Sequence, residues 1–196
     1  MFLSEPPADD RVRVMYDEDI DTDGYVKNLT RLWAWRPDVH EAFEGARDLA
    51  LRESGLSGRD VALLVVATAA ARADSYCALG WGSRLAARAD ADTAARVLAG
   101  SVAGLDDRGT ALVQWASQVA TNPNSTTAAE VDRLRGVGLD DRQIFGATVF
   151  IALRMAFSTV NDAFGAQPDL QLAHKVPAPV RAAVTYGRPP ADSPSA

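Results

Sequence analysis

The sequence has one cysteine, Cys77, and only two histidines and two lysines among 196 residues. A single cysteine cannot form a disulfide within the chain, so we expect a reducing compartment, the cytoplasm. Lys27 and Lys175 are isolated, and no stretch gathers basic residues. Because the formal net charge is −6 as well, we expect no nucleic-acid partner.

Several other signals are missing from the sequence. The first residues lack the basic and long apolar regions of a signal peptide. The apolar segments are interrupted by Arg, Asp or Gly, so we expect no membrane span. His40 and His174 have no ligand partners at metal-binding spacing, and neither a glycine-rich phosphate loop nor a Ser-His-Asp arrangement is visible. We therefore expect no metal and no cofactor.

Every periodic segment of the chain has a helical period, and none alternates apolar and polar residues as a half-buried strand does. The fold predicted is therefore all-α. With 47% hydrophobic residues, the chain can build one sizeable core. We expect an N-terminal arm over 1–23 that is mostly irregular, a helical domain over 24–166, and a proline-containing tail over 167–196 that wraps or frays. Helices are expected over these ranges: 25–35, 37–53, 59–73, 75–89, 92–99 and 140–164. Another helix is expected behind a cap at Asp106 or Asp107 with its apolar stripe over 112–119, and one more behind the capping signal 126–130 with its stripe over 131–137.

The most informative stretch is the apolar run 59–73 with the segment 74–82 behind it. The run is too long for a strand and rich in alanine, so it predicts a buried helix. Asp74 or Ser75 is a good N-cap for the next helix. Cys77 then falls in the first turn, where free N–H groups and the helix dipole favour a thiolate.

The sequence also contains an internal echo. Residues 55–61 match 138–144 at an offset of 83 residues, and the apolar helices that follow each segment align at the same offset. Alanine-rich helices match by chance quite often, so duplication of a helical unit stays one of two interpretations.

The order of several short motifs resembles a known family. Residues 24–29, a helix from Pro37, Gly55-Leu56 with Arg59-Asp60, Tyr76-Cys77, and the segments 130–144 and 160–165 resemble the alkylhydroperoxidase D-like proteins. That family includes the carboxymuconolactone decarboxylases, and the second half of the chain resembles its peroxidase-related branch. The resemblance spans about residues 25–172. It implies a helical bundle that assembles as dimers, trimers or a hexamer.

The sequence departs from the pattern of active members, which carry Cys-x-x-Cys followed four residues later by His. Here Asp74 occupies the place of the first cysteine and Trp81 that of the histidine. The family's proton-relay glutamate would fall at Ala62. Asp60 could replace it only if the connection were two residues longer.

The candidate catalytic residues are therefore Cys77, Asp74 and Asp60. Cys77 is either a peroxide-reducing thiol or a small buried residue in a packing seam. Asp74 is an N-cap or a proton shuttle, and as a neighbouring anion it would raise the pKa of the thiol. Candidate pocket residues, each with a packing or hydrogen-bonding alternative, are Tyr76, Trp81 and Asn161.

Two functional hypotheses follow. The first is a one-cysteine, thiol-dependent antioxidant enzyme of the peroxiredoxin type, restored by an external thiol. The alternative is a non-enzymatic oligomeric descendant of the fold that binds a small apolar ligand or a protein. A decarboxylase-type lyase is less favoured because no acid–base pair is evident. A transcriptional regulator lacks the basic helix-turn-helix it would need.

We predict that the protein sediments as a stable oligomer of at least two chains. The expectation comes from the resemblance and from four tryptophans in a small helical protein, Trp33, Trp35, Trp81 and Trp115. Sedimentation velocity at micromolar concentration measures the assembly directly. A single monomeric species there would contradict the prediction.

Overall fold

The computed structural model describes residues 1–193, and every regular element in that range is a helix. The all-α prediction is confirmed. The eleven α-helices and one short 3-10 helix are α1 (Asp10–Asp23), α2 (Asn28–Trp33), α3 (Pro37–Leu51), α4 (Gly58–Ala71), α5 (Ser75–Arg88), α6 (Ala91–Leu98), α7 (Asp107–Thr121), η1 (Pro123–Ser125), α8 (Ala128–Gly136), α9 (Asp141–Ala163), α10 (Leu170–Lys175) and α11 (Ala178–Ala183).

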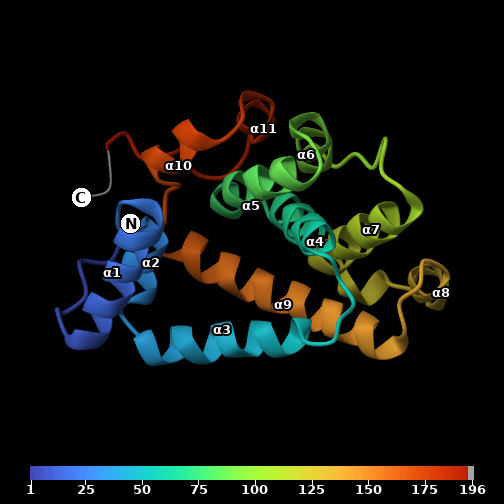
Figure 1. Cartoon of the computed structure of the whole chain (residues 1–196), viewed down its shortest axis with the longest axis horizontal. Helices are drawn as coiled ribbons and strands as arrows, with labels where there is room; N and C mark the ends of the chain where they lie inside the picture. Colours follow the sequence, from blue (N-terminus) through green and yellow to red (C-terminus); the bar gives the residue numbers. More distant parts are fainter. Residues whose placement is uncertain (194–196) are drawn as a thin grey trace.

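Helix α4 lies at the centre of the core. Its residues from Ala62 to Ala69 are all buried, as the apolar run predicted. Helices α5, α6, α7 and α9 pack around it (Figure 1). Each fully buried leucine or valine contributes roughly 1.5–3 kcal/mol. This helix therefore anchors the chain immediately before Cys77.

Helices α3 and α9 run side by side in opposite directions along one edge of the molecule (Figure 1). They approach closely at Gly146, where an added Cβ would lie 2.6 Å from the carbonyl oxygen of Ala50. Only glycine fits that crossing. No residue of α3 is fully buried. Leu49 and Phe145 remain exposed beside the crossing.

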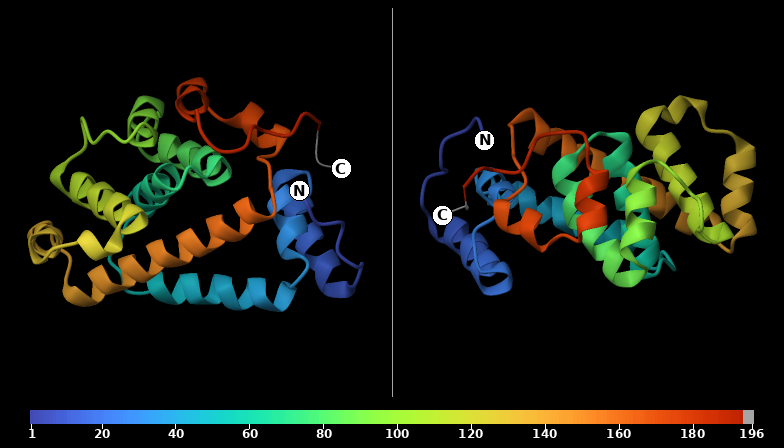
Figure 2. Two further views of the ribbon diagram at one scale, coloured as in Figure 1. Left: turned by 180° about the vertical axis from the view of Figure 1, so that it is seen from behind. Right: turned by 90° about the horizontal axis from the view of Figure 1, so that it is seen from above.

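The N-terminal arm and the tail are more ordered than expected. The arm was predicted to be mostly irregular, but residues 10–23 form α1, which Asp9 caps by accepting a hydrogen bond from Val12 N at 2.9 Å. The tail forms α10 and α11, and α11 packs on α5 and α6. The start of the chain and the last described residues lie at the same side of the molecule (Figure 2). The last part of the predicted tail, residues 194–196, lies outside the described residues.

The two segments that match at an offset of 83 residues each begin a helix with the same capping arrangement. Ser57 and Asp60 form a capping box at α4, and Asp140 and Gln143 form one at α9. The preceding glycines, 55 and 138, both have positive φ. Beyond these starts the two units differ, because α4 ends at Ala71 whereas α9 continues for 23 residues. Duplication itself stays a hypothesis.

The tryptophans do not all support the assembly argument made from the sequence. Trp33 and Trp115 belong to the core, and only Trp35 is exposed.

Helix α9 alone among the described helices has the length and composition of a membrane span, a property it shares with core helices of soluble proteins. It packs against α3, α4 and α7.

We predict that Asp60→Ala lowers the free energy of unfolding by about 2–3 kcal/mol. Asp60 is buried and accepts hydrogen bonds from Ser57 N at 3.0 Å and Arg108 Nε at 3.1 Å. Arg108 also donates to the carbonyl oxygens of Gly55 and Val137, so it ties together the two capped helix starts. Urea denaturation followed by circular dichroism measures the loss. The exposed Asp107→Ala serves as the matched control, and equal stabilities of the two variants would contradict the prediction.

Candidate functional site

Cys77 lies in the first turn of α5, as predicted. Asp74 is the N-cap, and its Oδ1 accepts a hydrogen bond from Cys77 N at 2.9 Å. The preceding turn includes Ala73 in a left-handed conformation with φ 55°. This turn reverses the chain after α4 and directs the Cys77 side chain toward α9, where Arg154 contacts it.

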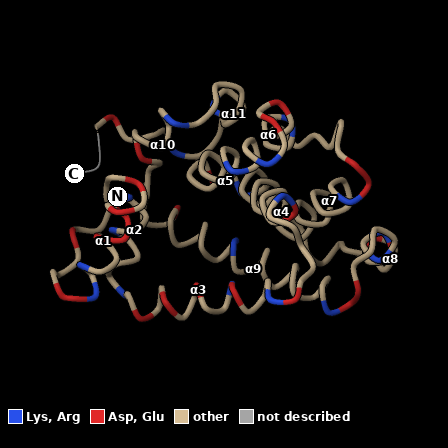
Figure 3. The backbone as a smooth tube through the Cα atoms, in the orientation of Figure 1, with Lys and Arg blue, Asp and Glu red and all other residues tan. Residues whose placement is uncertain are grey.

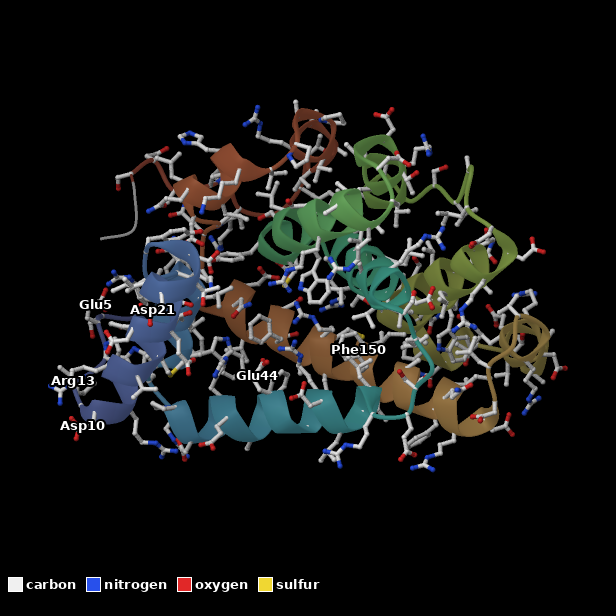
Figure 4. The ribbon with its side chains drawn as sticks, viewed as in Figure 1. Glu5, Asp10, Arg13, Asp21, Glu44 and Phe150 are labelled. Carbon is white, nitrogen blue, oxygen red and sulfur yellow. The ribbon has the colours of Figure 1, made fainter. Side chains whose placement is uncertain are left out.

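The Cys77 side chain lines a pocket of about 520 Å³. Helices α5 and α9 supply one wall and α3 supplies the opposite one, from which Glu44 points toward α9 (Figure 4). Residues 25–27 and helix α2 continue the walls within the predicted helical domain. Helix α1, from the N-terminal arm, and α10, from the tail, add to the walls from outside that domain. A pocket of this volume suits a small organic molecule.

The electrostatics of Cys77 differ from the expectation of a helix-start thiolate. The residue is only 4% exposed. Burial raises the pKa of its thiol to about 12, the charge of Arg154 opposes this, and Asp74 raises it further. Desolvation therefore outweighs the helix dipole, which is worth at most about 2 kcal/mol. The direction predicted for Asp74 is confirmed.

Asp74 is completely buried. Its Oδ2 accepts a hydrogen bond from Ser158 Oγ of α9. The tail covers the same helix start, because Ser75 Oγ donates to the carbonyl oxygen of Arg188 at 2.6 Å. The carboxylate is thereby fixed beside the thiol and sealed from bulk water on that side.

Arg154 is the site residue that the sequence analysis missed. It is 4% exposed, and its Nη2 donates to Cys77 Sγ at 3.0 Å. It interrupts the apolar stretch of α9, whose tube carries little charge over most of its length (Figure 3). A lone arginine inside an apolar helix was a visible signal, since buried charges are rare without a role. The 77 residues that separate it from Cys77 concealed the contact.

Trp81 lies one turn beyond Cys77 and lines the same pocket, as predicted. Two guanidinium groups flank its indole, with Arg84 at 4.6 Å and Arg154 at 5.6 Å from the ring centroid. Desolvation and the charge of Arg154 lower the pKa of Arg84, and the same two causes lower that of Arg47 across the pocket. Three arginines therefore converge on one cavity.

The other predicted residues lie at or away from this pocket. Tyr76 borders it, but its hydroxyl already donates to Asp169 Oδ2. Asn161 is buried and bonds across helices, accepting from Trp33 Nε1 at 2.9 Å, as one of its two interpretations held. Asp60 is not among the pocket residues and serves the capping box of α4. Cys77, Tyr76 and Trp81 therefore line the pocket, and Asp74 lies beside Cys77 without lining it, whereas Asp60 and Asn161 are not part of the pocket wall.

His40 borders the pocket from α3, and burial lowers the pKa of its imidazole. Its ring lies 5.5 Å from that of Trp33. Within residues 1–193, no three His, Cys, Asp or Glu side chains form a cluster suited to a metal ion.

Comparison with solved structures identifies the fold. A peroxidase-related protein from Ralstonia eutropha JMP134 with an alkylhydroperoxidase AhpD core superposes with a TM-score of 0.76 at 24% identity, covering 87% of this chain and 93% of that one. A peroxidase-related protein from Silicibacter sp. TM1040 gives 0.77 at 22% identity, with the same coverages. The resemblance inferred from the motifs is confirmed in the fold, which is the alkylhydroperoxidase D-like bundle.

A third similar structure is the debrominase Bmp8. Its cysteine-to-alanine variant in complex with 2,3,4-tribromopyrrole superposes with a TM-score of 0.67 at 15% identity, covering 93% of this chain and 95% of that one. No protein-family model matches the chain, and no curated protein matches it.

We predict that iodoacetamide alkylates Cys77 roughly 10²-fold more slowly at pH 8 than it alkylates free cysteine. The raised pKa lowers the thiolate fraction, and the greater nucleophilicity of a high-pKa thiolate offsets part of that loss. Asp74→Asn removes the anion that raises the pKa, so it accelerates alkylation several-fold. Ser158→Ala removes a hydrogen bond that lowers the pKa, so it slows the reaction.

Intact-mass spectrometry over time measures these rates, because Cys77 is the sole thiol. Circular dichroism checks that each variant is folded. A wild-type rate equal to that of free cysteine would show that Cys77 is not held as a buried thiol.

Proposed function

We propose that the protein is a thiol-dependent hydroperoxide reductase in which Cys77 is the nucleophile. The observation that carries the proposal is the placement of Cys77 Sγ in a cavity of about 520 Å³, 3.0 Å from Arg154 Nη2 and beside the Asp74 carboxylate. The AhpD-core fold of the peroxidase-related neighbours supports it.

The geometry favours proton transfer during the attack over a preformed thiolate. With a thiol pKa of about 12, the thiolate fraction at pH 7 is on the order of 10⁻⁵. Asp74 hydrogen-bonds the thiol and takes its proton as sulfur attacks the terminal oxygen of the hydroperoxide. Arg154 stabilises the negative charge that develops on sulfur and oxygen.

The O–O bond breaks as the S–O bond forms. The departing alkoxide receives the proton that Asp74 holds, which gives the alcohol and leaves Cys77 as a sulfenic acid. Two equivalents of an external thiol then restore Cys77 and yield water and a disulfide of the reductant. An external reductant is required because the chain has no second cysteine.

The alternative is that the protein binds a small ligand without turnover. The raised thiol pKa favours it, as does Trp81 at the place that the resemblance assigns to histidine.

The debrominase neighbour suggests a further electrophile as a substrate. A thiol can take the bromine of an aryl bromide while the ring carbon takes the proton. An external thiol then attacks the brominated sulfur, which releases bromide and forms a disulfide. Tribromopyrrole is therefore a second substrate to assay.

We predict that the wild type consumes cumene hydroperoxide with dithiothreitol as reductant and that Cys77→Ser does not. Asp74→Asn should slow turnover about 10²-fold, because the alkoxide loses its proton donor. The same variant should accelerate alkylation of Cys77, so the two assays move in opposite directions. A ferric–xylenol orange assay measures the peroxide, and intact mass detects one added oxygen.

If Asp74 only raised the thiol pKa, Asp74→Asn would accelerate both reactions, and its role as proton carrier would be excluded. If peroxide neither disappears nor oxidises Cys77 under conditions that oxidise surface methionines, the reductase is excluded.

A further inference from the structure

Arg154 is a buried cation without a carboxylate partner. It is 4% exposed, forms no ion pair with any described residue, and donates to Cys77 Sγ as its one hydrogen-bond acceptor among them. A buried charge is costly unless an opposite charge or several hydrogen bonds compensate it. Its remaining guanidinium N–H groups border the cavity and are free to donate.

Arg84 is a second cation at the rim of the same cavity, and it also forms no ion pair with a described carboxylate. Trp81 holds the two guanidiniums on its ring through cation–π contacts, at 4.6 Å for Arg84 and 5.6 Å for Arg154. Arg154 is therefore fixed by packing before any ligand binds, whereas the exposed Arg84 lies over the ring at the rim of the cavity.

Each carboxylate that borders the cavity already has a hydrogen-bond or ion-pair partner. Glu44 pairs with Arg47, and Lys27 pairs with both Asp19 and Asp23. Asp169 accepts hydrogen bonds from Tyr76 Oη and Asn28 N. Three cations on the cavity wall, Arg84, Arg154 and Lys175, thus have no carboxylate partner among the described residues, and of these Arg154 contacts the Cys77 sulfur.

We propose that Arg84 and Arg154 form a subsite for the carboxylate of a small organic anion, placing its reactive group beside Cys77. The planar fork of a guanidinium matches a carboxylate. Phe157 and the leucines Leu29 and Leu172 supply apolar wall for the body of the molecule. As an assignment of substrate class the proposal rests on the proposed function, whereas the binding it describes does not require turnover.

Calorimetric titration of the Cys77→Ser variant with benzoate tests the subsite without any redox reaction. We expect a dissociation constant at or below about 1 mM for benzoate and binding at least about tenfold weaker for the neutral benzyl alcohol. Arg154→Met should weaken benzoate binding about tenfold or more, and Arg84→Gln by a smaller factor. Trp81→Leu, which frees both guanidiniums, should also weaken it.

Arg88→Gln is the matched control, since Arg88 lies on the same helix one turn beyond Arg84 and does not line the cavity. It should change benzoate affinity less than about twofold. Arg154→Lys keeps the charge and should recover part of the affinity lost in Arg154→Met, a result that a purely structural role would not give. Circular dichroism and thermal melting verify folding.

Equal affinity for benzoate and benzyl alcohol, or no benzoate binding at 20 mM, would overturn the proposal. Tighter binding of inorganic phosphate than of benzoate would overturn its carboxylate assignment. The kinetics of peroxide reduction distinguish a failure of the carboxylate subsite from a failure of the proposed reductase. If benzoate binds as expected but peroxide is not reduced, only the reductase fails; if peroxide is reduced with the same KM for a carboxylate-bearing hydroperoxide and its methyl ester, only the subsite fails.

Discussion

The contact between Arg154 and Cys77 determines what this site can do. It places a guanidinium 3.0 Å from a sulfur in a position where both groups are almost fully buried. Burial raises the pKa of the thiol, and the same burial strengthens the attraction between a cation and any negative charge that forms on sulfur. The raised pKa favours a protonated thiol at rest, while the environment favours the negative charge that the proposed attack would develop on sulfur.

The fold supports this contact by fixing both of its partners. Helix α4 is buried through its middle and ends at the turn that begins α5, so Cys77 starts from a rigid base. Arg154 comes from the middle of α9, which α3, α4 and α7 hold on different sides. Ser158, one turn further along α9, bonds the same Asp74 that caps the cysteine helix. Two residues one turn apart on α9 thus contact the Cys77 sulfur and the Asp74 carboxylate together.

The helices could be predicted from the sequence because their signals are local. Capping residues and apolar periodicity place α4, α5 and α9 within about two residues of their observed bounds. Helix α1 was missed because its residues are mostly charged and carry little apolar periodicity. Of the site, the sequence predicted only residues within one helix turn of Cys77, namely Asp74, Trp81 and Cys77 itself. Arg154, Arg47 and the walls from α1 and α10 depend on long-range packing that periodicity does not encode.

The position of Trp81 shows how a site can change its means of stabilising charge. The resemblance assigns this place to a histidine, a side chain that moves protons. The indole found here cannot take up a proton, but its ring face attracts cations, and it holds Arg84 and Arg154 near the sulfur. In the proposed reaction, proton transfer falls to Asp74, one turn before Cys77, at the place that the resemblance gives to a cysteine. Under that proposal the two departures from the family pattern are complementary, because the carboxylate would supply the base while the arginines would supply a positive field that a neutral imidazole would not.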